Sequence, residues 1–223
     1  MNSLTFVVGA VPASVLLPLL LAVMLNAGLR GTAFFRSLYF LPIVTSGVAA
    51  ATVFKWIYAK QFGPLNQLVG LVGIPRQDWL FDERLVIPAL VLMAVWHRVP
   101  LNIIFYLAAL QSVPRSLYEA AEIDGAGSWA KFRYVTWPMV TPTTFFVLII
   151  TVIAMLLGAF DIVNVMTQGG PLEASNVFVF NIWRTAFIYF QYGYASAMAY
   201  ILFLVVLGFT ALQWVLQRHW VHY

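Results

Sequence analysis

One arginine of this chain lies where a charge is most costly, in the middle of an apolar stretch. Arg98 interrupts the run of residues 85–110, and an arginine at the centre of a membrane helix costs at least about 2.5–3.5 kcal/mol on insertion scales. Its side chain must therefore face protein or water. Asn102 follows one helical turn later, so the two side chains could line a path for a solute and hydrogen-bond its hydroxyl groups. The alternative is a structural pair that holds the kinks of Pro88 and Pro100.

A second polar pair stands at the end of another apolar stretch. Asp161 and Asn164 are three residues apart and close the run that begins near residue 140. They could belong to the same path or to a gate at its outer end, or they could be a helix end that meets water. The chain has no cysteine, and it contains no G-x-x-x-x-G-K-[ST], H-E-x-x-H or G-x-S-x-G motif. We therefore expect no catalytic, cofactor or metal site.

The elements that position these side chains must lie in a lipid bilayer. Of the 223 residues, 62% are hydrophobic and 9% are charged, against roughly 25% charged in soluble domains. A bilayer core of about 30 Å needs roughly 20 apolar residues per helix, which predicts an all-α polytopic bundle, one domain over residues 1–223, with five transmembrane helices. Their expected ranges are 4–25, 39–58, 85–110, 140–161 and 194–216. Lysine and arginine residues are scattered singly, so no nucleic-acid partner is expected.

The most polar stretch of the chain is the loop 111–138, between the third and fourth expected spans. Pro114 can stand in the first turn of a helix, and Gly125 ends that helix. Ser128 is expected to cap a second short helix, and Pro138 leads into the next span. The sequence therefore predicts a helix, a tight turn and a helix that project from the membrane.

One surface of this projection is small and is flanked by acidic residues. Ala120 and Ala121 let the backbone of another protein approach closely, while Glu119 and Asp124 offer carboxylates to its lysine or arginine side chains. Arg115 and Glu119 are also spaced for an ion pair across one helical turn. We interpret the loop as a docking element for another protein.

The loop resembles the EAA loop of inner-membrane permeases in binding-protein-dependent ABC importers. The family pattern is E-A-A, three residues, G, nine residues, I, one residue, L-P. Valine replaces the isoleucine and tryptophan the leucine, and the residues that match are Glu119, Ala120, Ala121, Gly125 and Pro138. The resemblance implies a cytoplasmic coupling helix that docks in a cleft of an ATPase subunit. Glu119 and Asp124 would then be polar contacts, the two alanines the close-approach surface and Gly125 the turn.

Further segments resemble the MalF-type carbohydrate permeases. They are the motifs within residues 30–42, Gly63-Pro64-Leu65-Asn66, residues 107–114 and Gln168-Gly169-Gly170-Pro171. This resemblance implies the type I ABC importer permease fold in a bacterial or archaeal plasma membrane. It also implies four partners: a MalG-type second permease, two ATPase subunits that bind ATP and Mg, and an extracytoplasmic solute-binding protein. The implied cargo is a sugar, an oligosaccharide or a related polyol or glycerophosphate compound.

Permeases of this type usually carry one further span at the N-terminus, so residues 4–25 correspond to their second span. We expect a start upstream of Met1 rather than a permease of five helices. The resemblance places the loop 111–138 and the C-terminus in the cytoplasm. Two alternatives remain at this point. An ion-coupled secondary transporter should show buried acidic or histidine side chains in broken helices, and a scaffold without transport would not need such a loop.

Overall fold

The computed structural model describes residues 1–26 and 41–220, and every regular element in these ranges is a helix. Four helices are long and apolar enough to cross a membrane. They are α1 (Asn2–Asn26), α5 (Val86–Ser112), α8 (Trp137–Met166) and α10 (Tyr192–Trp220). The all-α bundle is confirmed, and each of these four helices overlaps one of the expected spans.

The second expected span, 39–58, has a different form in its described part. Residues 41–44 are helical, the helix stops at Thr45, and α3 (Gly47–Ile57) begins after Ser46. Ser46 takes an extended backbone conformation, and its side-chain oxygen accepts a hydrogen bond from the backbone N–H of Ala49 at 3.2 Å. A serine cap of this kind starts a new helix, so this segment is interrupted where a continuous span was expected. Residues 39 and 40, like most of the 30–42 motif, lie outside the described ranges.

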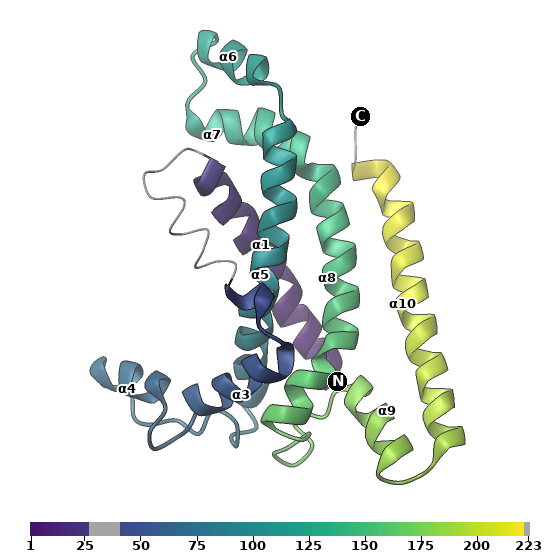
Figure 1. Cartoon of the computed structure of the whole chain (residues 1–223). Coiled ribbons are helices and arrows are strands. Elements are labelled where there is room, and N and C mark those ends of the chain that lie inside the picture. The colour runs from purple at the N-terminus through teal and green to yellow at the C-terminus, as the bar shows by residue number, and fades with distance from the viewer. Residues whose placement is uncertain (27–40, 221–223) are drawn as a thin grey trace.

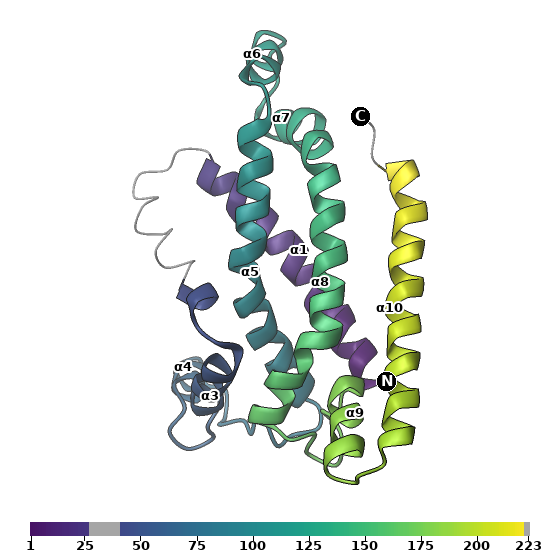
Figure 2. The same ribbon diagram turned by 45° about the vertical axis from the view of Figure 1, so that its right-hand side comes forward.

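The core lies where α1 packs against both α5 and α8. Figure 2 shows α1 inclined across these two helices. Ala10 and Ala22 of α1 are fully buried, as are Leu90 of α5 and Val147 of α8, and the small alanines allow the helices to approach closely. By contrast, most side chains of α10 are exposed and apolar. That helix therefore presents its surface to lipid or to another subunit.

The two ends of the bundle carry different short helices (Figure 1). At one end α6 (Arg115–Ile123) and α7 (Ser128–Lys131) project beyond the spans, near the C-terminal end of α10. At the other end lie the N-terminus, α4 (Pro64–Leu71) and α9 (Phe178–Phe187).

Candidate functional site

The predicted turn of the projecting loop is confirmed. Gly125 has φ +75°, a conformation in which a Cβ is strained. The N–H of Ala126 donates to the carbonyl of Ala121 at 2.8 Å, and the N–H of Gly125 donates to that of Glu122 at 3.0 Å. These two bonds end α6 in a Schellman motif. The expected cap at Ser128 is wrong, because Ser128 is already the first residue of α7.

The hairpin α6–α7 is almost uncovered by the rest of the chain. No residue of α6 is buried, and of the predicted coupling residues only Ala121 is half-covered. The exposed ones are Glu119, Ala120, Asp124, Gly125 and Pro138. Two large apolar side chains also lie open, Ile123 at 88% exposure and Trp129 at 74%. Exposed apolar groups of this size, beyond the spans, are typical of a surface that binds another protein.

Two side-chain contacts hold the hairpin in shape. The carboxylate of Glu122 pairs with the Lys131 ammonium at 2.6 Å, and the hydroxyls of Tyr118 and Thr136 lie 3.0 Å apart. The expected Arg115 pair with Glu119 is not among the ion pairs of the described residues. Sequence spacing missed both contacts, because they join α6 to residues beyond the turn.

The second half of the hairpin runs into the membrane without a gap. A π-helical turn, η1 (Phe132–Thr136), links α7 to α8, and together they form one helix from Ser128 to Met166. Single π-turns inside helices are frequent at functional sites. A displacement of the hairpin can therefore pass directly into a membrane-spanning helix.

A cavity of about 220 Å³ lies where α1, α3, α5 and α8 meet. Its polar side chains are His97 and Arg98 of α5 and Asp161 of α8. Small residues leave the space open, among them Ala154 and Gly158 of α8, and a Cβ added at Gly158 would meet nothing within 4 Å. The structure thus brings together Arg98 and Asp161, which belong to two different polar pairs along the sequence.

The interruption before α3 lies beside this cavity. The Nε2 of His97 donates to the carbonyl of Thr45 at 3.3 Å, at the end of the preceding helical piece. On the other side of the break, a Cβ added at Gly47 would lie 3.6 Å from an Oδ of Asp161. A carboxylate is favourable near the N-terminus of a helix, where the backbone N–H groups are unpaired. His97 and Asp161 therefore stabilise the two ends of the interruption.

Asn102 does not line the cavity. It is fully buried, and its Nδ2 donates to the carbonyl of Ser14 at 2.6 Å and to the hydroxyl of Thr151 at 3.0 Å. The Ser14 carbonyl lacks its normal helical donor because residue 18 is a proline without an N–H. Asn102 thus joins α1, α5 and α8 beside Pro18, which is not one of the two prolines considered in the sequence. Asn164 is half-buried and lies outside the lining of the cavity.

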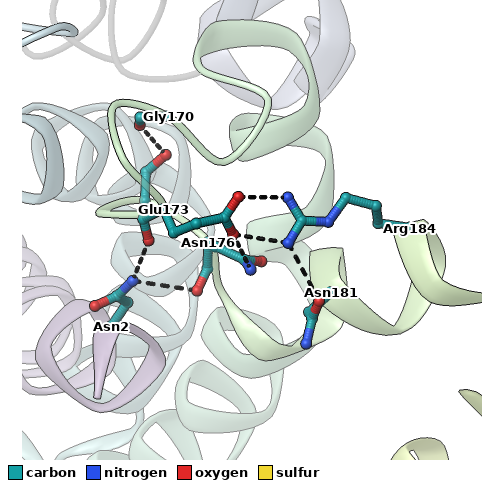
Figure 3. Close-up of polar contacts among 7 residues, drawn as sticks. Asn2, Gly170, Glu173, Asn176, Asn181 and Arg184 are labelled. Carbon is teal, nitrogen blue, oxygen red and sulfur yellow. Dashed lines mark hydrogen bonds and ion pairs between the residues drawn. The ribbon is translucent and has the colours of Figure 1, made fainter. Parts of the chain in front are cut away.

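The loop between α8 and α9 is attached to α9 and to the start of α1 (Figure 3). Two oxygens of Glu173 pair with Arg184 of α9, each at 2.7 Å. The amide of Asn2 donates to the backbone carbonyls of Glu173 and Asn176 at 2.7 and 3.3 Å. The hydrogen bond and charge of Arg184 lower the pKa of the Glu173 carboxyl below its ordinary value. Sequence spacing did not predict this cluster, because Asn2 lies 171 positions before Glu173.

The Gly63-Pro64-Leu65-Asn66 motif organises the loop that follows α3. Asn66 is buried; its Oδ1 accepts from the Gln77 backbone and from the Trp79 indole, both at 3.0 Å. Its Nδ2 donates to the carbonyl of Gln77 at 2.9 Å. A Cβ at Gly63 would lie 2.4 Å from two backbone oxygens, so only glycine fits there. This motif is structural in the chain.

Comparison with known proteins agrees with these features. The model of a family described as "binding-protein-dependent transport system inner membrane component" matches residues 1–221. The probable ABC transporter permease protein YesP of Bacillus subtilis is 34% identical over 98% of this chain and 71% of its own length. The sn-glycerol-3-phosphate transport system permease protein UgpA of Agrobacterium fabrum is 31% identical over 93% of this chain and 70% of its own length.

The fold is also that of solved transporters. A chain of a bacterial ABC transporter that imports the acidic polysaccharide alginate has a TM-score of 0.90 and 24% identity, over 98% of this chain and 77% of that one. The same transporter in complex with an alginate-pentasaccharide-bound periplasmic protein gives a TM-score of 0.88. With the four apolar helices and the family match over almost the whole length, the conclusion is direct. This chain belongs to the family of inner-membrane components of binding-protein-dependent transport systems, as a multi-pass permease.

Proposed function

We propose that this chain is the pore subunit of an ABC importer whose cargo is a carbohydrate or a related polyol or glycerophosphate compound. The exposed hairpin α6–α7 carries the proposal. It retains the EAA spacing, projects beyond the spans and leaves large apolar groups without a cover. Relatives named for sn-glycerol-3-phosphate transport support the cargo class.

Hydrolysis of ATP, completion of the pore and delivery of the cargo belong to partner proteins. Two ATPase subunits bind ATP and Mg and hydrolyse the nucleotide, because this chain carries no phosphate-binding loop. A MalG-type permease completes the pore, and an extracytoplasmic binding protein delivers the cargo. The alginate transporter, which has the same fold, forms a complex with a periplasmic protein.

The hairpin and the end of α10 face the cytoplasm in this proposal. Both lie at the same end of the bundle (Figure 1). One orientation of the chain in the membrane therefore agrees with both predictions. The opposite end, with α4, α9 and the Glu173 cluster, then faces the binding protein. Closure of the ATPases pulls the hairpin, α8 moves with it, and the cavity beside Arg98 and Asp161 opens alternately to each side.

The test is a bulky substitution on the close-approach surface of the hairpin. Ala121→Trp and Gly125→Pro should lower ATP-dependent uptake by proteoliposomes at least about tenfold, or about 1.4 kcal/mol in coupling, while the chain stays inserted. Proline cannot adopt the positive φ of Gly125. Ser116→Trp is the matched control, because residue 116 lies about 140° around the helix from residue 121.

Normal transport by both variants would refute the coupling role of the hairpin. Copurification decides between the transport classes. An ATPase recovered with the chain supports the importer, whereas uptake that depends on an ion gradient and not on ATP indicates a secondary transporter. A chain that recovers no ATPase and moves no solute would be a scaffold.

A further inference from the structure

The cavity between α1, α3, α5 and α8 holds a cation whose charge the described residues do not balance. Arg98 has no hydrogen bond or ion pair to any residue in 1–26 or 41–220, and its Nε is buried without an acceptor. Asp161 lines the same cavity, but no guanidinium nitrogen lies within 4.0 Å of its carboxylate. A charge inside the membrane needs water, a counter-charge or a ligand.

The two neighbouring polar side chains are already engaged. His97 donates to the carbonyl of Thr45, and the Asp161 carboxylate lies against Gly47 at the start of α3. Both contacts stabilise the interruption of the helix, and neither side chain forms a hydrogen bond or ion pair with Arg98 within the described residues. Asn102, one turn along α5, is bound to α1 and α8 instead. Among the described residues, the Arg98 guanidinium is therefore the polar group of the cavity that has no hydrogen-bond or ion-pair partner.

We infer that the cavity binds a hydroxylated oxyanion, and that Arg98 selects it. The inference rests on the proposed function and narrows the cargo to a polyol that carries a carboxylate or a phosphate. A guanidinium binds either oxyanion through paired, charge-assisted hydrogen bonds. The Asp161 carboxylate lines the same cavity, and it has lone pairs beyond those turned toward α3 that can accept hydrogen bonds from hydroxyl groups. Neutral cargo would leave the Arg98 charge unbalanced.

The space fits one small unit of such cargo. The cavity measures about 220 Å³, enough for a glycerol phosphate or for one residue of an acidic oligosaccharide. Its opening depends on the missing side chain of Gly158, since a Cβ there meets nothing within 4 Å. A leucine at this position would take up part of the cavity from α8.

The experiment is a binding titration of the purified complex of both permeases and both ATPases, in phosphatidylcholine discs and without binding protein. The probes are two pairs, glucose with glucuronate and glycerol with sn-glycerol 3-phosphate. At least one anionic probe should bind at least about tenfold more tightly than its neutral counterpart, because its oxyanion forms charge-assisted hydrogen bonds with Arg98. Arg98→Gln should reduce this ratio below about twofold, with Arg98→Lys in between.

Two controls separate the site from general effects. Gly158→Leu should abolish binding of the preferred probe, whereas Gly208→Leu, on the open surface of α10, should leave it unchanged. Arg84→Gln removes an exposed positive charge outside the cavity and should keep the preference. Discs that contain phosphatidylglycerol test whether a lipid headgroup takes the place of the cargo; weaker probe binding there would assign Arg98 to lipid.

Four results would overturn the inference: equal affinity within both pairs, no binding of either anionic probe, an undiminished preference in Arg98→Gln, or competition by anionic lipid. None of them affects ATP-driven uptake of a neutral sugar. A complex that transports neutral cargo without preference would thus remove the oxyanion site and keep the importer, whereas a chain without an ATPase would remove the importer itself.

Discussion

Replacing Asn102 with leucine should loosen the packing of α1, α5 and α8. The amide of Asn102 donates to the Ser14 carbonyl at 2.6 Å and to the Thr151 hydroxyl at 3.0 Å. Leucine has a similar volume and cannot donate. The Ser14 carbonyl would then be buried without a partner, because Pro18 provides no N–H one turn later.

The magnitude follows from the two hydrogen bonds. Interhelical hydrogen bonds in membranes contribute about 0.6 kcal/mol on average and up to about 1.7 kcal/mol. Loss of both predicts a decrease of about 1–3 kcal/mol in the free energy of unfolding. In a Pro18→Ala background, residue 18 donates to the Ser14 carbonyl within α1. The decrease in the free energy of unfolding caused by Asn102→Leu should then be smaller by the contribution of one hydrogen bond, about 0.6–1.7 kcal/mol.

The assay is a double-mutant cycle with unfolding by SDS in bicelles. The Oδ1 of Asn102 is buried without a partner, but its removal is common to both backgrounds and cancels in the cycle. Pro12→Ala is the matched control, because Pro12 is a second proline inside α1 that frees the carbonyl of residue 8 instead. Equal costs of Asn102→Leu in the wild-type and Pro18→Ala backgrounds would refute the link between Asn102 and Pro18.

Three further predictions concern the two ends of the bundle. Tyr118→Phe combined with Lys131→Met removes both contacts that hold the hairpin and should lower uptake per ATP hydrolysed several-fold, measured in proteoliposomes, with little change in insertion. Arg184 lowers the pKa of the Glu173 carboxyl from its ordinary value of 4.5. The stability that this ion pair gives the loop is therefore present above pH 4.5 and is lost as the pH falls through the lowered pKa. Hydrogen exchange of residues 170–176 measures this loss, and Glu173→Gln should abolish its pH dependence. Asn66→Ala leaves several half-buried partners unpaired and should destabilise the loop 59–80 by about 1–3 kcal/mol, read as faster proteolysis.

Each of these has an outcome that contradicts it. Full coupling in the double variant would show that the hairpin needs no internal support. Hydrogen exchange that changes with pH equally in Glu173→Gln would assign the effect to other groups. Unchanged proteolysis of Asn66→Ala would mean that Gly63 alone shapes the loop.

The sequence predicted best what depends on local composition. Long apolar runs located α1, α5, α8 and α10 within a few residues, since twenty apolar residues have few alternatives in a bilayer. Gly125 marked the end of α6 because a positive φ favours glycine. These features need no knowledge of which helices touch.

Contacts between helices could not be predicted from local composition in this way. Hydropathy alone does not show that Ser46 caps a new helix inside the second apolar run, because serine is common in spans. Arg98 and Asp161 are 63 positions apart in the chain, and only the packing of α5 on α8 brings them to one cavity. Asn102 was assigned to the path with Arg98 by spacing, whereas its partners lie on α1 and α8.

The uninterrupted helix from Ser128 to Met166 has a mechanical consequence. Its π-helical turn, which ends at residue 136, and the open side of Gly158 belong to one hydrogen-bonded element, separated by about 33 Å of helix at 1.5 Å per residue. A tilt of about 5° at this turn would shift the backbone at Gly158 by about 3 Å. That shift approaches the diameter of a water molecule, so a small rotation at the membrane surface is enough to widen or close the space beside Arg98.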